Sequence, residues 1–496
     1  MSKYAPVACL FQTDAYKLGH IQQYLLSGNV SRVYSNFTNR KSRIEGVNHV
    51  VHFGLQAFLQ RYAIDAFEPF FAADEDLVAS LYEERVTSIL GPNTIGSDHI
   101  RALHRKGFLP LEFRAVPEGT PVPIGVPSFT IENTDPEFFW LTNYIETVVS
   151  AEVWQASTSA TIAHEFRKIF VRDAIATGCD IAAVDWQGHD FSYRGMSSSE
   201  TAAASGAGHL LSFTGTDSLV SLEWIDNFYG GAYIAGSVPA TEHSVMSTGI
   251  AKIGEQELFS RLLDLYPTGI FSAVSDTFDL WKVLTVYLPN LKEKVLARDG
   301  KIVIRPDSGD PVDIITGTVP WTTGDRSHLT PAEKGVIELL WDTFGGAENA
   351  AGFKLLDSHV GMIYGDSITR NRASEINERL AAKGFASINW VAGIGSFTYQ
   401  YNTRDTFSSA MKATYAIVDG LPVNLFKNPI TDNGMKKSAI GRLAVLKNAD
   451  DELTLIQEAT PEQEAASELK LVWRDGKFIT KQTFPEVREV LATSKY

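Results

Sequence analysis

The sequence has 496 residues, of which 44% are hydrophobic and 21% are charged. This length exceeds that of a simple single domain, and the composition is that of a folded globular protein rather than a disordered chain. The net charge of −15 argues against a nucleic-acid backbone or an anionic membrane as a partner. An anionic small ligand would therefore need a local basic pocket in an acidic protein.

The chain contains only two cysteines, Cys9 and Cys179, so a disulfide framework is excluded and a reducing compartment is indicated. No run of apolar residues approaches the length of a membrane-spanning helix. Residues 1–14 also lack the basic stretch followed by an apolar stretch that marks a secretion signal. We therefore expect a cytoplasmic protein.

Three helix signals stand out in chain order. Thr134-Asp135-Pro136-Glu137 is a capping-box pattern, and the apolar residues that follow, up to Val149, share one helical face. Residues 161–177 form a helix-like stretch that stops at Gly178. Thr330-Pro331-Ala332-Glu333 repeats the capping box, with proline at the first helical position.

Between about residue 180 and residue 396, short apolar runs repeatedly end in polar, acidic or glycine-rich loops. The runs are residues 181–184, 210–213, 232–235, 271–274, 302–304, 360–364 and 388–391. Helical stretches fit between most of them. Parallel strands that alternate with helices, with reactive side chains at the strand ends, are typical of an α/β barrel. A doubly wound open sheet is the competing architecture.

The outer segments have a different pattern. Residues 1–155 and 400–496 mix strand-like runs, such as 32–37 and 470–473, with helices. We predict that they form a second α+β lobe, built from both ends of the chain, and that residues 156–399 form the barrel with its catalytic loops.

The loop Arg305-Pro306-Asp307-Ser308-Gly309-Asp310 follows a predicted strand. Arginine suits bidentate phosphate binding, and aspartate suits ribose hydroxyls or a magnesium ion. Two glycine loops, Gly365-Asp366-Ser367 and Gly393-Ile394-Gly395-Ser396, could bring backbone N–H groups close to a phosphate. An ordinary surface turn is the alternative for each of the three.

His243, preceded by Glu242, lies in another loop at a strand end. Such a histidine could be a base, a metal ligand, a phosphoryl acceptor or simply structural. Asp276 is a candidate partner, because a carboxylate on one ring nitrogen fixes the tautomer and leaves the other nitrogen nucleophilic. His189-Asp190 could suggest an HD-type phosphohydrolase, but the further histidine and aspartate of that site are not identified in the sequence.

An ordered set of short motifs then resembles one known family. The set is Thr13-Asp14-Ala15-Tyr16-Lys17, Asn133-Thr134-Asp135-Pro136-Glu137, His189-Asp190-Phe191, Tyr193-Arg194-Gly195, Gly215-Thr216-Asp217, Glu242-His243-Ser244, Ser275-Asp276, Arg305-Pro306-Asp307-Ser308-Gly309 and Gly365-Asp366. From about residue 8 to about residue 490 the chain resembles the nicotinamide phosphoribosyltransferases. The resemblance implies an irregular (β/α) barrel of the type II phosphoribosyltransferase kind with a second lobe. It also implies a homodimer whose active sites are shared between subunits.

The resemblance implies roles around the base. Phe191 and Tyr16 of the partner subunit would stack on the two faces of the pyridine ring. Asp217 would accept a hydrogen bond from the carboxamide N–H₂ group and would repel the carboxylate of nicotinate. Arg194 and Arg305 would hold the base, the diphosphate or the ribose phosphate.

It also implies a site for phosphoribosyl pyrophosphate (PRPP). The residues are Asp307 and Asp366 for the ribose hydroxyls, Gly395 and Ser396 for the 5′-phosphate, Arg404 and Lys412 of the partner subunit for the same phosphate, and Arg40 and Lys427 near pyrophosphate or ATP. Gly365 would also belong to the PRPP site. Mg²⁺ would be held mainly by pyrophosphate, with no direct side-chain ligand assigned. ATP would phosphorylate His243, with Glu242 and Asp276 orienting the ring.

Two other functions fit the same fold. A nicotinate phosphoribosyltransferase would share the PRPP chemistry, although Asp217 argues against it. A catalytically idle homologue that senses ligands would keep the binding residues without the turnover.

Overall fold

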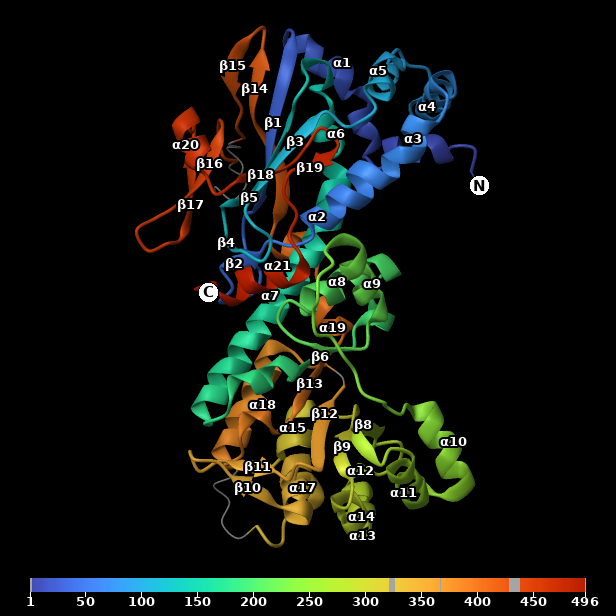
Figure 1. Cartoon of the computed structure of the whole chain (residues 1–496), viewed down its shortest axis with the longest axis vertical. Helices are drawn as coiled ribbons and strands as arrows, with labels where there is room; N and C mark the ends of the chain where they lie inside the picture. The colour runs from blue at the N-terminus through green and yellow to red at the C-terminus, as the bar shows by residue number, and fades with distance from the viewer. Residues whose placement is uncertain (1, 321–325, 366, 428–437, 496) are drawn as a thin grey trace. The chain divides into compact units, whose positions relative to one another are not determined.

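The computed structural model describes residues 2–320, 326–365, 367–427 and 438–495, and its chain folds into two compact units (Figure 1). Unit 1 comprises Met1–Thr161, Trp224–Tyr233 and Asn402–Tyr496, and unit 2 comprises Ile162–Glu223 and Ile234–Tyr401. The predicted boundaries, after residues 155 and 399, lie a few residues away from these divisions. Residues 224–233, which the sequence placed in the barrel, belong to unit 1 instead.

The packing of Trp224 and Tyr229 explains this difference. Their rings lie 5.6 and 5.3 Å from the ring of Phe53 in unit 1. The Tyr229 hydroxyl also donates a hydrogen bond of 2.6 Å to the buried carboxylate of Glu118. Aromatic burial with a satisfied hydroxyl favours this placement, and the local apolar pattern gives no sign of it.

Unit 1 is built on a seven-stranded antiparallel sheet of order β15-β14-β1-β5-β3-β18-β19. Its strands are β1 (Val30–Asn39), β3 (Leu111–Ala115), β5 (Pro127–Asn133), β14 (Ser409–Val418), β15 (Leu421–Asn424), β18 (Lys470–Arg474) and β19 (Lys477–Phe478). The N-terminal strands β1, β5 and β3 form the middle of this sheet, and two C-terminal strands flank them on each side. The strand-like runs predicted at 32–37 and 470–473 are confirmed as parts of β1 and β18.

Smaller elements complete unit 1. They are the strand pairs β2 (His49–Val51) with β4 (Pro121–Pro123) and β16 (Leu443–Lys447) with β17 (Leu453–Gln457), and the helices α1 (His20–Tyr24), α2 (Leu55–Phe58), α3 (Glu68–Ala72), α4 (Glu75–Leu90), α5 (Asp98–Lys106), α6 (Leu141–Tyr144), α20 (Pro461–Ala466) and α21 (Phe484–Ala492). The sheet buries a stack of aromatic rings, in which Phe37 lies 4.8 Å from Phe129, and Phe113 lies 5.6 Å from Trp473. Such rings supply most of the apolar area of a core.

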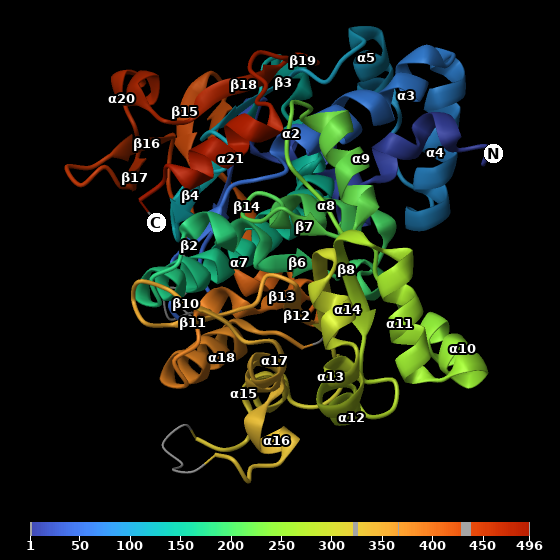
Figure 2. The ribbon, with the colours of Figure 1, turned by 60° about the horizontal axis from the view of Figure 1, so that its bottom comes forward.

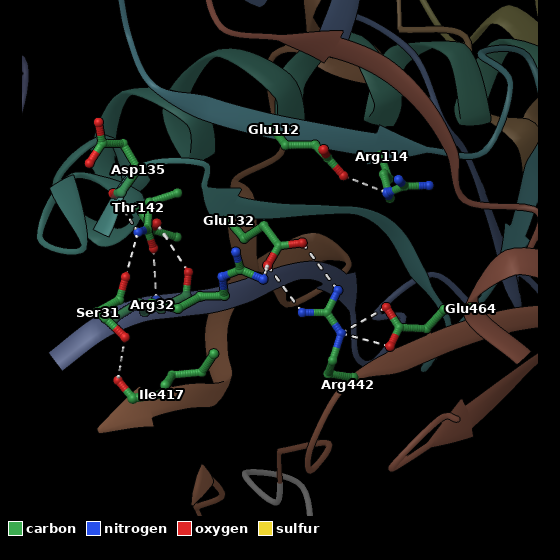
Figure 3. Close-up of polar contacts among 12 residues, drawn as sticks. Ser31, Arg32, Glu112, Arg114, Glu132, Asp135, Thr142, Ile417, Arg442 and Glu464 are labelled. Carbon is green, nitrogen blue, oxygen red and sulfur yellow. Dashed lines mark hydrogen bonds and ion pairs between the residues drawn. The ribbon is translucent and has the colours of Figure 1, made fainter. Parts of the chain in front are cut away.

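A charged cluster centred on Arg442 ties three elements of unit 1 together (Figure 3). Its guanidinium binds Glu132 of β5 at 3.1 Å and Glu464 of α20 at 2.7 Å. The same group lies 4.7 Å from the ring centre of Tyr34 in β1. Because arginine offers several donors in one plane, a single side chain satisfies both carboxylates.

Unit 2 contains a six-stranded parallel sheet of order β7-β6-β13-β12-β9-β8. Its strands are β6 (Gly188–Asp190), β7 (Gly215–Thr216), β8 (Thr268–Val274), β9 (Asp299–Arg305), β12 (Val360–Tyr364) and β13 (Val391–Ile394). Gly236 pairs with Gly215 of β7 at one edge, and Ala240 pairs with Ser272 of β8 at the other. One short segment therefore bridges both edges, so the sheet is an irregular barrel and not the competing open sheet.

Helices follow most strands of unit 2. They are α8 (Ser199–His209), α10 (His243–Ile253), α11 (Glu255–Leu265), α12 (Leu280–Lys282), α13 (Leu288–Asn290), α14 (Lys292–Leu296), α15 (Pro311–Thr316), α16 (Pro331–Lys334), α17 (Val336–Phe344), α18 (Arg370–Ala382) and α19 (Ser396–Tyr399), with a small hairpin of β10 (Gly346–Glu348) and β11 (Lys354–Leu356). Two further helices, α7 (Glu146–Ala176) and α9 (Leu219–Phe228), include residues of both units. In both ribbon views α10 and α11 lie next to each other (Figures 1 and 2).

The predicted strands fall into two groups. The runs at 271–274, 302–304 and 360–364 are confirmed within β8, β9 and β12. The others are wrong or displaced: 181–184 is a 3₁₀ turn, 210–213 follows α8, 232–235 forms no strand, and only the last residue of the run at 388–391 lies in β13. A short continuous apolar run can be buried in a turn or at a helix end as well as in a strand, so such a run does not by itself identify a strand.

Among the helix signals, the capping box at Thr330 is confirmed at the start of α16. The pattern at 134–137 instead caps a 3₁₀ turn, because the Asp135 side chain accepts from the N–H of Glu137. The predicted helix at 161–177 is the last part of the longer α7, which ends one residue before Thr177.

Candidate active site

Loops at the carboxyl ends of the parallel strands surround a cavity of about 500 Å³ in unit 2. Its lining consists of Phe191, Arg194, Asp217, Arg305, Asp307, Gly365, Ser367, Gly395, Ser396 and Phe397. Eight of the predicted site residues thus lie around one cavity although they span about 200 positions of the sequence. Asp366 lies outside the described residues.

Phe191 is held at this cavity by the backbone of the neighbouring strand. Its N–H group donates to the carbonyl of Ile394 at 3.0 Å. A Cβ atom at Gly393 would lie 2.7 Å from the Phe191 ring, so only glycine leaves room for this ring position. A second cavity of about 420 Å³, with apolar walls that include Val303 and Trp390, shares Phe191 with the first. A flat aromatic ligand suits this boundary.

Asp217 follows β7 and borders both cavities. Its carboxylate lies 3.0 Å from Nε2 of His189 and also accepts a hydrogen bond from the Ser237 hydroxyl. Burial acts to raise the pKa of Asp217, but the hydrogen bond from His189, with smaller contributions from Ser237 and Arg305, brings that pKa below its usual value. The site therefore presents an ionised acceptor.

Two arginines, Arg194 and Arg305, lie at the same cavity as the carboxylates of Asp217 and Asp307. The Arg305 guanidinium donates to the carbonyl of Thr241, which fixes its direction. Burial lowers the pKa of Arg305, the carboxylates of Asp307 and Asp217 oppose that change, and Arg194 adds to it. Two cations close enough to disfavour each other's charge suit a ligand with several negative oxygens.

The loop from Arg305 to Ser308 is held by Asp276. One carboxylate oxygen of Asp276 accepts from the backbone N–H groups of both Asp307 and Ser308, each at 2.9 Å. The other oxygen is buried and has no hydrogen-bond partner in the described part of the chain. Asp276 is thus a loop-holding residue, which differs from its predicted contact with His243.

His243 begins α10, and its side chain is 49% exposed. Its Nε2 atom lies 3.3 Å from a carboxylate oxygen of Asp307. The predicted neighbour Glu242 instead accepts from the hydroxyl of Ser244. Potential ligand atoms of His243, Asp276 and Asp307 all lie within 4.8 Å of one another. The two carboxylates suit a hard divalent cation, whereas the sequence analysis assigned no side-chain ligand to Mg²⁺.

Ser396 lies against Gly195, where an added Cβ atom would approach the serine hydroxyl to 1.9 Å. The close approach requires glycine at position 195 and places the Ser396 hydroxyl at the edge of the cavity. Gly365 and Gly395 have no such crowding, since every atom near their ideal Cβ position is 3.8 Å away or more.

The remaining predicted residues belong to unit 1. Burial lowers the pKa of Lys412, and Arg40, Arg404 and Lys17 lower it further against the opposing charge of Glu146. Arg40, Arg404 and Lys412 therefore form a local cationic cluster. The Tyr16 ring is 64% exposed. The side chain of Lys427 is exposed, and its backbone N–H donates to Ser438.

Comparison with known proteins decides the family. Residues 186–476 match the model of the nicotinate phosphoribosyltransferase (NAPRTase) family, and residues 8–68 match the nicotinamide phosphoribosyltransferase N-terminal domain. The nicotinamide phosphoribosyltransferase of Acinetobacter baylyi is 48% identical, with 97% of this chain and 96% of the relative covered. This chain belongs to the nicotinamide phosphoribosyltransferase family. The family member from Xanthomonas campestris is 33% identical, with 97% of both chains covered.

Solved structures agree with the fold of the family. Nicotinate-nucleotide pyrophosphorylase from Pyrococcus furiosus superposes with a TM-score of 0.57 at 14% identity, covering 99% of this chain and 96% of that one. Human nicotinic acid phosphoribosyltransferase gives 0.55 at 17% identity, covering 97% and 93%. The predicted type II phosphoribosyltransferase fold is confirmed. Across the described ranges, no helix combines the length and apolar character that a membrane crossing requires.

Sequence reasoning did not assign Ser237 or the contact of His189 with Asp217. His189 carried a usable signal, since it lies in β6 two residues before Phe191, which directly follows that strand, and alternate residues of an extended chain point to the same side. Ser237 carried none, because it lies outside the named strands.

Proposed function

We propose that this chain transfers the phosphoribosyl group of PRPP to nicotinamide, giving nicotinamide mononucleotide and pyrophosphate in NAD salvage. The observation that carries this function is the ionised carboxylate of Asp217 next to Phe191 and Arg305 at one cavity. An anionic acceptor attracts the carboxamide N–H₂ group of nicotinamide and repels the carboxylate of nicotinate. Relatives in the same family carry the corresponding name.

The reaction needs positioning more than proton transfer. The lone pair of the pyridine nitrogen forms the bond to C1′ while the bond from C1′ to the pyrophosphate oxygen breaks. Phe191 orients the ring, and Asp307 contacts the ribose hydroxyls. Arg194 and Arg305 stabilise negative charge on the departing group. When bound, Mg²⁺ neutralises charge on pyrophosphate, and Asp276 and Asp307 offer the oxygen ligands that it prefers.

A phosphohistidine at His243 is the second part of the proposal. The exposed ring has one nitrogen, Nε2, near Asp307, so Nδ1 is the nucleophile. A bond forms from this nitrogen to the γ-phosphorus of ATP, the bond to the bridging oxygen breaks, and ADP leaves. Water later hydrolyses the phosphohistidine. This cycle would couple ATP hydrolysis to tighter binding of PRPP.

The third part is a homodimer with shared sites. The exposed Tyr16 ring and the cluster of Arg40, Arg404 and Lys412 support it, because both lie in unit 1 and suit a pyridine ring and a phosphate. Mixing Tyr16→Ala with Asp217→Ala subunits gives one unaltered site in each mixed dimer. Random mixing should restore about a quarter of the wild-type activity. No recovery after verified exchange of subunits would contradict a shared site.

The transfer itself is tested by product formation from PRPP, Mg²⁺ and either base, with and without ATP. We expect kcat/KM for nicotinamide to exceed that for nicotinate by about 100-fold or more. Equal values would assign the chain to nicotinate as well, and no product from either base would favour the ligand-sensing alternative.

A further inference from the structure

Three neighbouring chain segments of unit 2 converge on Asp217. His189 of β6 is paired with Gly215 of β7, and Gly215 is paired in turn with Gly236. Asp217 and Ser237 directly follow these last two segments, so all three side chains emerge at one end of the barrel. The N–H group of Asp217 also donates to the carbonyl of Asp190, which fixes the backbone at this point.

Both neighbours act on the same oxygen of Asp217. His189 Nε2 lies 3.0 Å from Oδ1, and the Ser237 hydroxyl donates to that same Oδ1. None of the described residues donates a hydrogen bond to Oδ2, and the side chain of Asp217, which borders the cavity, is 43% exposed. Two donors satisfy one oxygen, so the second remains an open acceptor for a ligand.

The position of the His189 ring is itself constrained. A Cβ atom at Gly215 would lie 2.6 Å from Nδ1, so this glycine leaves the space that the imidazole occupies. On another side, the ring centre lies 4.7 Å from that of Phe191 at an interplanar angle of 46°. Only 12% of the side chain is exposed. One imidazole therefore contacts both the aromatic ring and the carboxylate that face the base.

We propose that His189 and Ser237 are positioning residues that set base selectivity, because they saturate Oδ1 of Asp217 and leave Oδ2 directed at the carboxamide of the base. This inference rests on the proposed function. Without the two donors the carboxylate would rotate about its Cβ–Cγ bond. Oδ2 would then occupy several positions instead of one fixed position.

The test compares His189→Leu, His189→Gln and Ser237→Ala as full-length proteins. Leucine removes the donor, whereas the side-chain amide of glutamine can take the place of Nε2–H. The matched control is His359→Leu, because His359 also lies against a carboxylate, that of Asp357 at 2.6 Å, but outside the cavity lining. Steady-state kinetics with nicotinamide, nicotinate and PRPP give KM and kcat for each protein.

We expect His189→Leu to raise the KM for nicotinamide about tenfold and to lower the preference for nicotinamide over nicotinate by a similar factor. KM for PRPP should change less than about twofold, since the change is confined to the base side. Ser237→Ala should act in the same direction, and His189→Gln should recover most of the loss. His359→Leu should match the wild type.

Three results would overturn the inference. They are an unchanged KM for nicotinamide in both His189→Leu and Ser237→Ala, an equal rise for PRPP and nicotinamide, and a glutamine variant as impaired as the leucine variant. The wild-type arm separates this inference from the proposed function. A wild type that makes no product from nicotinamide overturns the function, whereas an active wild type with unresponsive variants overturns only the roles of His189 and Ser237.

Discussion

The carboxylate of Asp276 holds the backbone N–H of Asp307 at 2.9 Å and, through the same oxygen, that of Ser308. The position of the Arg305–Ser308 loop therefore depends on a residue in the loop after β8, the next strand of the sheet. Because Asp307 lies next to both His243 and Arg305, we expect a change at Asp276 to affect the surroundings of both residues together.

Two replacements of Asp276 distinguish the effect of its hydrogen bonds to the loop from the effect of its negative charge. Asparagine keeps a carbonyl oxygen that can accept both N–H groups, whereas alanine keeps none. We expect Asp276→Ala to lower kcat/KM for PRPP about 100-fold and Asp276→Asn about tenfold or less. Steady-state kinetics at varied PRPP measure both. If the two variants lose activity equally, the negative charge of Asp276 matters more than its hydrogen bonds.

Asp217→Asn tests the choice of base. With its carbonyl oxygen held by His189 and Ser237, the asparagine would present an N–H₂ group to the ligand. A donor at this place favours the carboxylate of nicotinate over the carboxamide N–H₂ group. We expect the ratio of kcat/KM for nicotinamide to that for nicotinate to fall about 100-fold. An unchanged ratio would place the origin of selectivity elsewhere in the cavity.

The phosphohistidine can be detected chemically. Incubation with γ-labelled ATP should leave a phosphate that is labile in acid and stable in base, as expected for phosphate on an imidazole nitrogen. His243→Ala should carry none. Equal labelling of this variant would refute the coupling mechanism while leaving the transferase assignment intact.

Arg442→Lys probes the charged cluster of unit 1. Lysine has one compact cationic group and cannot bind Glu132 and Glu464 in the same way, which leaves partly buried carboxylates without their partner. We expect a loss of about 2 kcal/mol in the free energy of unfolding, measured by urea denaturation. The control is Arg261→Lys, whose partner Glu257 is exposed on the same helix, with an expected change of about 0.5 kcal/mol or less. Equal losses in the two variants would contradict the importance of the cluster.

His52 makes stability depend on pH. Burial lowers the pKa of this histidine from 6.5 to about 3 in the folded protein. The unfolded chain therefore binds the extra proton first, and stability falls as the pH drops below 6.5. Between pH 7 and pH 5 this amounts to about 2 kcal/mol. Urea midpoints at the two pH values should show a smaller decrease for His52→Leu than for the wild type. An identical decrease would mean that His52 does not titrate in this way.

The sequence identified residues that lie around one cavity better than it identified the strands. Residues such as Arg305 and Asp217 were found because charged groups and glycines after apolar runs mark loops at strand ends. The hydrogen-bond partner of each side chain was harder to predict from the sequence. Asp276 lies near His243 as expected, but the hydrogen bonds of its carboxylate come from the backbone N–H groups of Asp307 and Ser308, which no side-chain pattern reveals. Likewise, β6 begins only at Gly188 because the apolar run before it forms a 3₁₀ turn started by Asp180.

The segment from Gly236 to Ala240 touches both edges of the parallel sheet and carries Ser237 between them. It pairs with Gly215 at one edge and with Ser272 at the other, which covers part of each edge against pairing with another chain. The same five positions thus pair with both edge strands and place the Ser237 hydroxyl against the carboxylate of Asp217. During evolution, a substitution at Ser237 could change the contact with Asp217 and leave the backbone path intact. An insertion or deletion between Gly236 and Ala240 would instead disrupt the pairing at one of the two edges.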